Sequence, residues 1–432
     1  MSQKFDCIVI GAGPAGITAG LNLARAGLEV IVLERGEYAG AKNMMGGVLF
    51  TKGLNEIIPE FWKEAPVERP VTRWVFSFLS SDSCLSADFS SINFREPPYN
   101  AFTVRRANFD QWYARKAEEA GVTLITDTLV EDLLWDQDKV VGVKVGRDNG
   151  ELFADAVIAA DGVNSLVTRK AGLYKDHSPY DLSLGVKEVL ELSEEYINKT
   201  FILHDGEGMA HTFVGAPTNG IAGGGFIYTN RRSVSIGVVV KLSSLVRSGL
   251  RPEDLLESFK HHSLIWPLIK EGVLREYSSH LIPEGATPAN KQLYTNGLLI
   301  AGDAARFTLS TGVRLEGANY AIMSGLAAAE AIKAARQKGD FSVKGLATYP
   351  RLLNQFGVLT DLRRFRHASK FLGNPRLYEV YPDAMCKLAE AVLTVEPKPK
   401  SGIFTLAREC FRGRVSYFNV VGDAIRAWRG LA

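Results

Sequence analysis

The feature that most constrains the fold is a glycine-rich turn between two apolar runs near the start of the chain. The apolar run 5–10 leads into Gly11-Ala12-Gly13-Pro14-Ala15-Gly16, and residues 17–26 then carry apolar side chains at helical spacing. Gly27 and a second apolar run, 30–33, follow. This order predicts a strand, a tight turn, a helix and a second strand, which is the βαβ unit of an α/β protein.

The Gly-x-Gly-x-x-Gly spacing also predicts a ligand. Gly11 permits the tight turn, Gly13 lets backbone approach a pyrophosphate, and Gly16 lets the helix pack on the strand. The N-terminus of the helix adds free N–H groups and partial positive charge. Glu34 ends the second strand about 20 residues on, where a carboxylate accepts hydrogen bonds from ribose hydroxyls. We therefore predict a dinucleotide site.

Two later turns favour a flavin over a nicotinamide dinucleotide. The stretch 159–165 contains Asp161-Gly162, and the stretch 300–305 contains Gly302-Asp303; each follows a predicted strand. Asp303 suits a ribityl hydroxyl. A helix beginning near 312–317 can point its N-terminus at the flavin N1/C2 carbonyl, where negative charge accumulates on reduction. Each dipeptide alone is more typical of a turn, but the three motifs in this order indicate FAD.

Periodicity and turn residues organise the rest of the chain. We predict a helix over 108–120 with Asn108 as its N-cap, and strands over 124–134, 140–146 and 151–159. The stretch Asp148-Asn149-Gly150 supplies a hairpin turn. A strand-rich stretch from about 178 to 280 contains a helix over 253–260; a buried strand, 298–301, and an Ala-rich helix ending near Lys338 follow. The predicted segments are an FAD-binding domain in three parts (1–75, 106–177 and 291–345), a β-rich domain in two (76–105 and 178–290) and a helical C-terminal region for partner docking (346–432).

Composition excludes several classes of protein. The 432 residues suffice for two or three packed units, and 50 Lys and Arg balance 48 Asp and Glu, so no overall field recruits nucleic acid. We find no 18-residue uncharged apolar run and no basic region ahead of an apolar signal core. We expect a cytoplasmic protein, with peripheral contact at the cytoplasmic face of the inner membrane as an open alternative.

The reactive side chains do not form a catalytic or metal-binding pattern. Four cysteines are scattered without a C-x-x-C pair, which argues against an iron–sulfur cluster or a structural zinc held by this chain alone. The seven histidines are dispersed apart from His261-His262, and a Gly-x-Ser-x-Gly nucleophile motif is lacking. We therefore predict no metal site and no catalytic side chain, with the chemistry residing in the cofactor.

The order of the three motifs resembles the FAD-dependent proteins with the glutathione-reductase-type fold, in the branch of hydroxylases, geranylgeranyl reductases and electron-transfer-flavoprotein:quinone oxidoreductases. Further stretches narrow the resemblance to the FixC group of the last family. They are Lys42-Asn43-Met44-Met45-Gly46-Gly47, Arg106-Ala107-Asn108-Phe109-Asp110, Gly223-Gly224-Gly225-Phe226-Ile227-Tyr228-Thr229-Asn230, His280-Leu281-Ile282-Pro283-Glu284-Gly285 and residues 302–325. The resemblance spans nearly the whole chain. It implies a Rossmann-like FAD-binding fold with an inserted β-rich substrate or quinone domain.

The resemblance also implies roles for individual residues. On the adenosine side it places Glu34 at the ribose, Arg35 near the adenosine and Val130 near adenine. It implies that the pyrophosphate is bound by the first turn, Gly11, Gly13, Pro14, Ala15 and Gly16, with Arg106 near the dinucleotide and Asp161 and Gly162 in the second turn. On the flavin side it places Gly302 and Asp303 at the ribityl or pyrophosphate part, Lys42, Asn43, Gly46 and Gly47 along the flavin, and Gly312 and Val313 near the flavin ring. Gly223 and Gly224 match positions where backbone approaches quinone. The alternative for this glycine run is a strand bulge without a ligand.

One departure from the family shapes the functional expectation. The quinone oxidoreductases continue into a ferredoxin-like segment with clustered cysteines, whereas Cys386 and Cys410 stand alone here. In the FixC arrangement a small FixX-type subunit carries the 4Fe–4S cluster, and an electron-transfer flavoprotein of FixA and FixB type supplies electrons. The resemblance thus implies the quinone branch of an NADH-dependent electron-bifurcating complex that also reduces ferredoxin or flavodoxin.

Several alternatives stay open at this stage. A geranylgeranyl-reductase-like enzyme and a non-catalytic FAD relay subunit are the rival functions. A second Gly-x-Gly-x-x-Gly unit is lacking, which disfavours direct reduction by NAD(P)H, although hydroxylases of this branch manage it without one. The basic stretch 362–370 is either a docking site for an acidic ferredoxin-like partner or a solvated helix face. The apolar stripe of Phe418, Val421, Ile425 and Trp428 either packs within the protein or a complex, or lies on a membrane surface.

Overall fold

A parallel sheet brings together the three FAD-type motifs, which lie near the start, in the middle and towards the end of the chain. The computed structural model describes residues 4–42, 46–146, 150–173, 178–284 and 292–431. The strand order of this first sheet is β16-β17-β10-β1-β2-β7, in which β17, β10, β1, β2 and β7 are parallel. The hairpin of β8 and β9 extends it from β10. The strands are β1 (Lys4–Ile10), β2 (Val30–Leu33), β7 (Thr123–Ile125), β8 (Val130–Asp136), β9 (Lys139–Val145), β10 (Glu151–Ala159), β16 (Tyr294–Thr295) and β17 (Leu298–Ile300).

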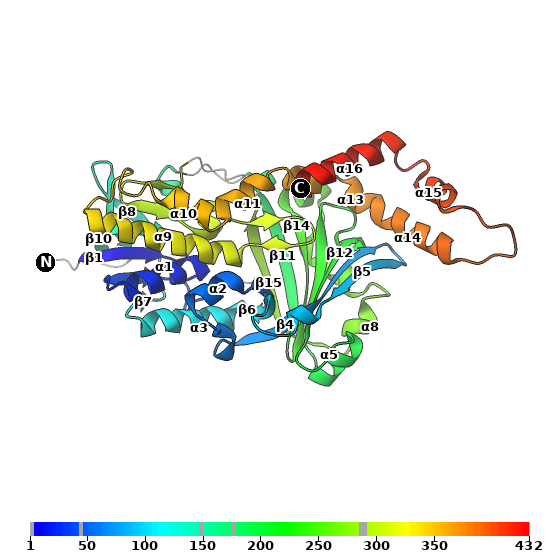
Figure 1. The fold of residues 1–432 in the computed structure, drawn as a ribbon, viewed down its shortest axis with the longest axis horizontal. Coiled ribbons are helices and arrows are strands. Elements are labelled where there is room, and N and C mark those ends of the chain that lie inside the picture. Colours follow the sequence, from blue (N-terminus) through cyan, green and yellow to red (C-terminus); the bar gives the residue numbers. More distant parts are fainter. Residues whose placement is uncertain (1–3, 43–45, 147–149, 174–177, 285–291, 432) are drawn as a thin grey trace.

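The second sheet is larger and mostly antiparallel. Its order is β15-β11-β14-β13-β12-β4-β6-β3, with β5 paired to β4, and β12 and β4 form its one parallel pair among the described residues. The strands are β3 (Gly46–Phe50), β4 (Val67–Leu79), β5 (Cys84–Ser90), β6 (Ala101–Arg105), β11 (Leu182–Glu191), β12 (Gly208–Gly215), β13 (Gly223–Thr229), β14 (Ser233–Lys241) and β15 (Val273–Pro283). Figure 1 shows this sheet at the centre of an elongated molecule. The expected α/β fold with a β-rich insertion and a helical C-terminal region is confirmed.

Helices cover one face of the first sheet, and the hairpin of β8 and β9 covers the other. Side chains of β1 alternate between two cores: Cys7 and Val9 pack under the helices, whereas Ile8 and Ile10 pack towards the hairpin. Burial on both faces explains why β1 is apolar almost throughout. The elements on these faces are α1 (Pro14–Arg25), α2 (Lys52–Ile57), α3 (Arg106–Glu119), α4 (Leu166–Lys170), α9 (Ala318–Lys338), α10 (Tyr349–Gln355) and α11 (Val358–Arg364).

The second sheet has its own core on the face away from the first sheet. Val186, Ile236 and Phe213 pack there against four short helices. These are α5 (Glu194–Thr200), α6 (Leu242–Ser248), α7 (Pro252–Lys260) and α8 (Trp266–Ile269). The predicted helix over 253–260 is therefore confirmed as α7.

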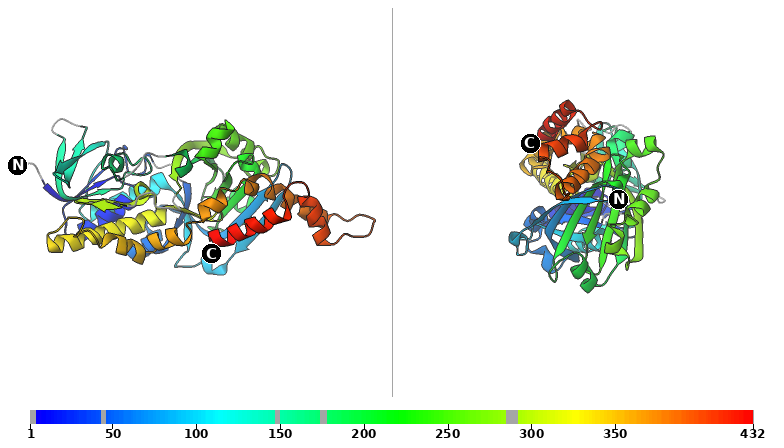
Figure 2. Two further views of the ribbon diagram at one scale, coloured as in Figure 1. Left: turned by 90° about the horizontal axis from the view of Figure 1, so that it is seen from above. Right: turned by 90° about the vertical axis from the view of Figure 1, so that its right-hand side faces the viewer.

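The C-terminal helices extend along and beyond the second sheet. Here α14 packs against β4, β5 and β12, α15 packs on α14, and α16 packs on α12. The views in Figures 1 and 2 agree that α14 and α15 project past the end of the sheet. These helices are α12 (Ala368–Leu372), α13 (Arg376–Glu379), α14 (Tyr381–Leu393), α15 (Ile403–Phe411) and α16 (Tyr417–Leu431). No helix among the described residues has both the length and the apolar character needed to cross a bilayer.

Two predicted elements differ from the structure. Asn108 is not an N-cap, because α3 begins two residues earlier, at Arg106, where a buried ion pair from Arg106 to Asp110 stabilises the first turn. The predicted strand 124–134 is divided at Asp127, whose φ is +48°, so that β7 pairs with β2 and β8 pairs with β9. The predicted turn at Asp148-Asn149 lies outside the described residues.

The division into six segments remains a prediction. Strands β3 and β4 begin before residue 76, yet both belong to the second sheet. Sheet membership therefore favours a first boundary closer to residue 46 than to residue 75.

Candidate functional site

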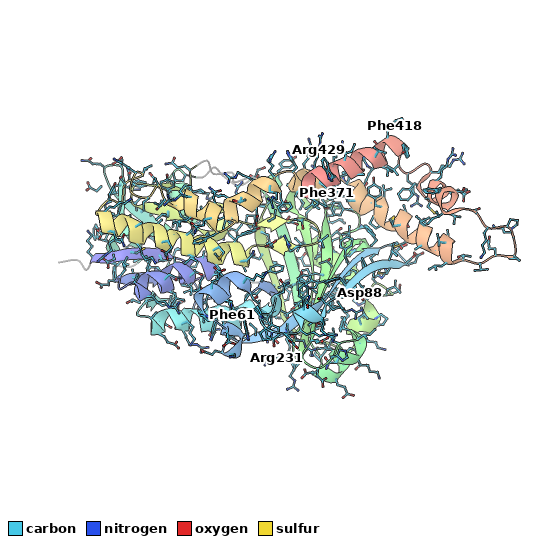
Figure 3. All side chains as sticks on the ribbon, in the orientation of Figure 1. Phe61, Asp88, Arg231, Phe371, Phe418 and Arg429 are labelled. Atoms are coloured by element: carbon cyan, nitrogen blue, oxygen red, sulfur yellow. The ribbon has the colours of Figure 1, made fainter. Side chains whose placement is uncertain are left out.

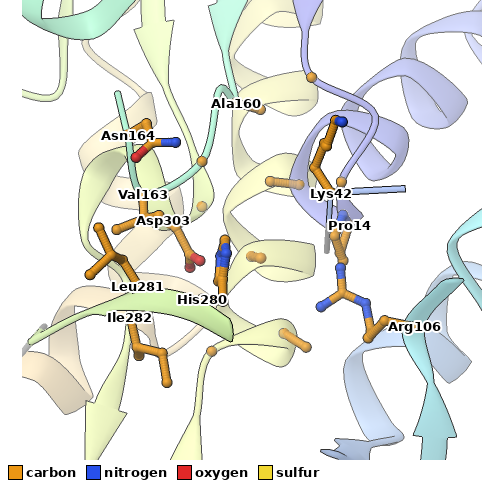
Figure 4. A pocket seen from close by; sticks show the side chains of 18 of the residues that line it. Pro14, Lys42, Arg106, Ala160, Val163, Asn164, His280, Leu281, Ile282 and Asp303 are labelled. Carbon is orange, nitrogen blue, oxygen red and sulfur yellow. The ribbon is translucent and has the colours of Figure 1, made fainter. Parts of the chain in front are cut away.

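A cavity lies between the carboxyl edge of the first sheet and one face of the second (Figure 4). Because β1, β10 and β17 are parallel neighbours, the turns that follow them meet at one edge of the sheet. Fourteen of the predicted cofactor residues line this cavity: Gly11, Gly13, Pro14, Ala15, Glu34, Arg35, Lys42, Gly47, Arg106, Val130, Asp161, Gly162, Gly302 and Asp303. The fold thus assembles residues that are almost 300 positions apart in sequence.

The turn after β1 is closely packed on its neighbours. Gly11 has a φ of +98°, and a Cβ there would collide with the carbonyl oxygen of Ala160 in the turn after β10. A Cβ on Gly16 would collide with the carbonyl oxygen of Gly11. Helix α1 begins at Pro14, and no side chain caps its N-terminus. Its first N–H groups therefore face the cavity, as a pyrophosphate requires.

Glu34 is held in a fixed orientation at the end of β2. Its Oε2 accepts a hydrogen bond from the Ala12 N–H at 2.8 Å, and its Oε1 accepts one from the Gly36 N–H at 2.7 Å. Only 9% of Glu34 is exposed. A carboxylate has about four acceptor sites, so two ribose hydroxyls can still bind it.

An arginine and a buried carboxylate share the middle of the cavity. Arg106 Nε and Nη2 each donate to Asp110 over 2.7 Å. Burial raises the pKa of the Asp303 carboxyl, and the charge of Arg106 opposes that rise. Among the described residues no hydrogen bond to the Asp303 carboxylate contributes to its pKa. Figure 4 shows Asp303 and Arg106 approaching the cavity from opposite sides. The Asp303 carboxylate is thus available to a ligand hydroxyl.

Asp161 contacts protein groups instead. Its Oδ2 accepts from the Val167 N–H at 2.9 Å, and its Oδ1 accepts from the Thr168 hydroxyl at 3.2 Å. Both donors belong to α4, so Asp161 ties the turn after β10 to that helix. Gly162 lines the cavity beside it. A direct contact of Asp161 with the cofactor remains a prediction.

The long helix α9 starts at the cavity, as the sequence predicted. Gly317 is its N-cap without a side-chain cap, and Gly317, Ala318 and Ala321 line the cavity. The preceding loop carries Gly312 and Val313 between the short strands β18 (Leu309–Ser310) and β19 (Leu315–Glu316). Neither residue is among those that line the cavity, and Val313 is 59% exposed. Their contact with the flavin ring remains a prediction.

Besides Gly312 and Val313, four predicted residues in the described part of the chain do not line the cavity: Gly16, Gly46, Gly223 and Gly224. Gly16 lies in α1 behind the turn that it supports. Gly223 and Gly224 begin β13, where Gly224 pairs with Val239 of β14. A Cβ on Gly224 would come within 2.7 Å of the Phe213 carbonyl oxygen, so close packing of strands accounts for this glycine without a ligand. Gly46 opens β3 opposite Arg105, and Asn43 lies outside the described residues.

The second sheet supplies a wall that the sequence analysis gave no role. Phe226 and Tyr228 of β13 stack with ring centroids 4.7 Å apart and line the cavity. Lys187 of β11 and Ser278 and His280 of β15 line it too. Burial, with Arg106 and Arg35 nearby, lowers the pKa of His280 to about 4, so the ring is neutral at physiological pH. A lysine inside a predicted strand was the available signal, since lysine is depleted in strands.

These features fit FAD. The uncapped N-terminus of α1 faces the expected pyrophosphate position, and the Glu34 carboxylate faces the expected ribose position. The Asp303 carboxylate can accept a hydrogen bond from a ribityl hydroxyl. The second N-terminus, that of α9, is available to the flavin N1/C2 carbonyl. The group would supply hydride or electron transfer there. The described residues contain no group of three or more His, Cys, Asp or Glu side chains that could hold a metal.

Comparisons with known proteins agree with this geometry. Residues 6–170 match the family described as FAD dependent oxidoreductase, and residues 368–431 match the ETF-QO/FixC family C-terminal domain. The chain is 41% identical to the probable electron transfer flavoprotein-quinone oxidoreductase YdiS of Escherichia coli K12, with 98% of each chain covered. It is 38% identical to the protein FixC of Azotobacter vinelandii, with both chains covered in full.

A solved structure shares the fold at low sequence identity. The geranylgeranyl bacteriochlorophyll reductase-like protein of Thermoplasma acidophilum superimposes with a TM-score of 0.75 at 20% identity. The match covers 98% of this chain and 99% of that one. This likeness extends the common architecture to both sheets and to the C-terminal helices.

Proposed function

Because the chain belongs to the ETF-QO/FixC family of FAD-dependent oxidoreductases, we propose that it accepts electrons from an electron-transfer flavoprotein and passes them to quinone. FAD is the cofactor. The electron-transfer flavoprotein of the proposal is of FixA and FixB type. We place the chain in the quinone branch of an NADH-dependent bifurcating complex, in which ferredoxin or flavodoxin is reduced elsewhere.

The observation that carries the proposal is the wall opposite the dinucleotide turn. The stacked rings of Phe226 and Tyr228 give that wall an aromatic, largely apolar surface. A planar quinone ring fits such a surface because stacked aromatic groups gain from both burial and ring packing. Gly223 and Gly224 lie at the start of the same strand, and we propose that they border the quinone.

A partner that carries an iron–sulfur cluster completes the proposal. Cys7 is buried in the core of the first sheet, and Cys386 is buried where α14 packs on β4, with its Sγ 3.4 Å from the Phe78 carbonyl oxygen. Cys84 is exposed and Cys410 is partly exposed. Burial raises the pKa of Cys386, which disfavours the thiolate that a cluster needs. We propose that a small ferredoxin-like subunit of FixX type holds the 4Fe–4S cluster.

The basic stretch 362–370 and the helix that carries the apolar stripe lie next to each other in the C-terminal region. Exposed Arg363, Arg364, Arg366 and Lys370 lie along α11 and α12, and α12 packs against α16. Arg426, Arg429 and the exposed Trp428 continue this surface on α16. Figure 3 shows Arg429 above Phe371 and places Phe418 towards the outer end of α16. We call these seven residues the basic C-terminal surface and propose that it docks the ferredoxin-like subunit, because an acidic partner complements its charge.

Purification of the tagged protein from its native cells tests the proposal. We expect FAD bound to this chain, iron bound only to a co-purified small subunit, and quinone reduction when the flavoprotein partners supply electrons. Stoichiometric iron on this chain would contradict the proposal. Saturation of prenyl double bonds by the isolated chain, without quinone reduction, would replace it by a prenyl reductase. Quinone reduction only within the reassembled complex would indicate a relay subunit.

A further inference from the structure

Three polar side chains follow one another along β15 towards the cavity. Glu276, Ser278 and His280 alternate with residues of the opposite face, and Lys187 of β11 lies directly across from Ser278 in the strand register. Lys187 Nζ lies 3.0 Å from Glu276 Oε1. Lys187, Ser278 and His280 all line the cavity, whereas Glu276 does not line it and its side chain is 35% exposed. A polar row therefore leads from solvent to the aromatic wall.

The pair of Lys187 and Ser278 is buried and incompletely satisfied. Only 6% of Lys187 and 3% of Ser278 are exposed. The Ser278 hydroxyl has no hydrogen-bond partner among the described residues. A buried hydroxyl without a partner is destabilising, because it has given up its hydrogen bonds to water. Because Ser278 lines the cavity, a ligand atom that reaches this hydroxyl would complete its bonding.

We propose that Lys187 and Ser278 donate hydrogen bonds to one carbonyl oxygen of the quinone and that Lys187 is the acid that protonates this oxygen during reduction. This inference rests on the proposed function and names the residues that would serve it. The aromatic rings of Phe226 and Tyr228 hold the quinone ring beside the pair. Lys187 is then a catalytic residue, and Glu276 is a positioning residue.

The step balances with one proton from the protein. Conversion of a quinone into a hydroquinone takes two electrons and two protons, and both C=O groups become C–OH groups. Reduced FAD would supply two electrons and one proton, and that proton would go to the far oxygen. Lys187 Nζ gives the second proton to the near oxygen and becomes a neutral amine. Water at the rim restores that proton by way of Glu276.

The surrounding charges suit an acid at this position. Burial lowers the pKa of Lys187, Glu276 raises it, and Arg105 and Arg106 lower it further, with a net decrease. Arg105 also lies 3.8 Å from Glu276 Oε2, so the carboxylate is shared between two cations. On the same face His280 is neutral above pH 5, and burial raises the pKa of Tyr228 to about 12, so neither ring is charged near neutral pH. A lysine with a lowered pKa releases its proton more readily near neutral pH.

A matched pair of lysines provides the test. Lys187→Met removes the proposed acid. Lys260→Met removes a lysine of α7 that lies 2.8 Å from Glu188 of β11, on the face of the sheet away from the cavity. Ser278→Ala removes only the hydroxyl, and Lys187→Arg keeps the charge but not the acidity. Each FAD-loaded variant is reduced chemically and mixed with a short-chain benzoquinone between pH 6 and 10. Binding of the quinone to the oxidised protein is measured from the change in flavin absorbance.

We expect Lys187→Met to slow quinone reduction by about 100-fold and to abolish the fall in rate at alkaline pH. Lys187→Arg should retain quinone binding but not the rate. Ser278→Ala should weaken binding about fivefold and leave the pH profile unchanged. Lys260→Met should lose thermal stability only.

Two outcomes would overturn this inference and leave the proposed function standing. The first is a Lys187→Met protein whose rate, quinone binding and pH profile match those of Lys260→Met. If Lys187→Met does not fold, the second is an unchanged rate and unchanged binding in both Lys187→Arg and Ser278→Ala. A wild-type protein that binds FAD but reduces no quinone would overturn the proposed function and this inference with it.

Discussion

Gly16 is a single residue on which the dinucleotide turn depends. Its missing side chain lets the Gly11 carbonyl lie against α1. We predict that Gly16→Ala costs about 1–3 kcal/mol of unfolding free energy, the usual cost of overpacking, and releases FAD. Thermal unfolding and flavin retention on gel filtration measure both effects. Gly422→Ala in α16 is the control, because a Cβ there meets nothing within 4 Å; an equal loss of FAD in both variants would contradict the prediction.

The partly buried side chain of His211 makes the free energy of unfolding depend on pH. Its ring lies 2.7 Å from the Ser77 hydroxyl and stacks on Phe213. Burial and Arg73 lower its pKa from 6.5 to about 3, against a smaller opposing effect of Asp88. The unfolded chain therefore binds more protons between pH 3 and 6.5, so unfolding free energy falls as the pH falls through this window.

We expect the loss attributable to His211 to be on the order of 1 kcal/mol between pH 6.5 and 5. His211→Gln should flatten this part of the stability curve, measured by urea unfolding at each pH. His204→Gln, at an exposed position, should leave the slope of the wild type. Identical slopes in all three proteins would show that His211 does not contribute.

The residues of the cavity divide into those that sequence can and cannot predict. Gly11, Glu34 and Asp303 were predictable because their spacing from strand ends fixes where they lie. Lys187 and Ser278 were not, since they are 91 positions apart and meet only through the register of β11 and β15. Strand register depends on the whole sheet, which local patterns do not determine.

The same distinction holds for whole elements. The strand, helix and strand at 4–33 follow from a periodic pattern and from turn glycines. Helix α3 starts at Arg106 because the ion pair with Asp110 is buried, and burial was not readable from the local pattern. The break between β7 and β8 likewise reflects different pairing partners, β2 and β9. Tertiary contacts, more than propensity, set these boundaries.

Besides its packing on α12, helix α16 is anchored to the body of the protein by one carboxylate. Asp423 accepts two hydrogen bonds of 2.7 Å from Arg376 and one of 2.7 Å from the Tyr381 hydroxyl. Hydrogen bonding to Arg376 is the main reason that the pKa of Asp423 lies well below its ordinary value. The contribution of this group is therefore complete above about pH 4 and is lost as the pH falls towards the lowered pKa.

We predict that Asp423→Asn loosens α16 and costs up to about 3 kcal/mol of its local stability, because Arg376 is left without its charged partner. Limited proteolysis between α15 and α16 should accelerate at least tenfold at pH 7, while FAD binding is unchanged. The exposed Arg251–Asp254 pair gives the control variant Asp254→Asn, whose stability should stay close to that of the wild type because water screens an exposed ion pair. Equal proteolysis of both variants would contradict an anchoring role for Asp423.

At the scale of the whole molecule, the FAD cavity and the basic C-terminal surface belong to different parts of one elongated body. The cavity lies between the two sheets, whereas the basic C-terminal surface lies on α11, α12 and α16, and no described residue of these helices lines the cavity. A partner that docks on this surface can therefore bind without disturbing the dinucleotide turn. Docking and cofactor binding should consequently respond to different substitutions.

We predict that the double variant Arg363→Glu, Arg366→Glu lowers the co-purified iron at least fivefold and leaves FAD content unchanged. The reason is that two attractive charges become repulsive towards an acidic partner, an effect that 0.5 M salt should reduce because salt screens surface charges. The control is Lys199→Glu with Lys270→Glu, two exposed lysines in α5 and at the end of α8. It makes the same change in net charge elsewhere and should leave iron recovery intact. The double arginine variant could instead keep its co-purified iron and lose the ability to float with vesicles that contain anionic lipid. That result would show that the surface binds a membrane and not the ferredoxin-like subunit.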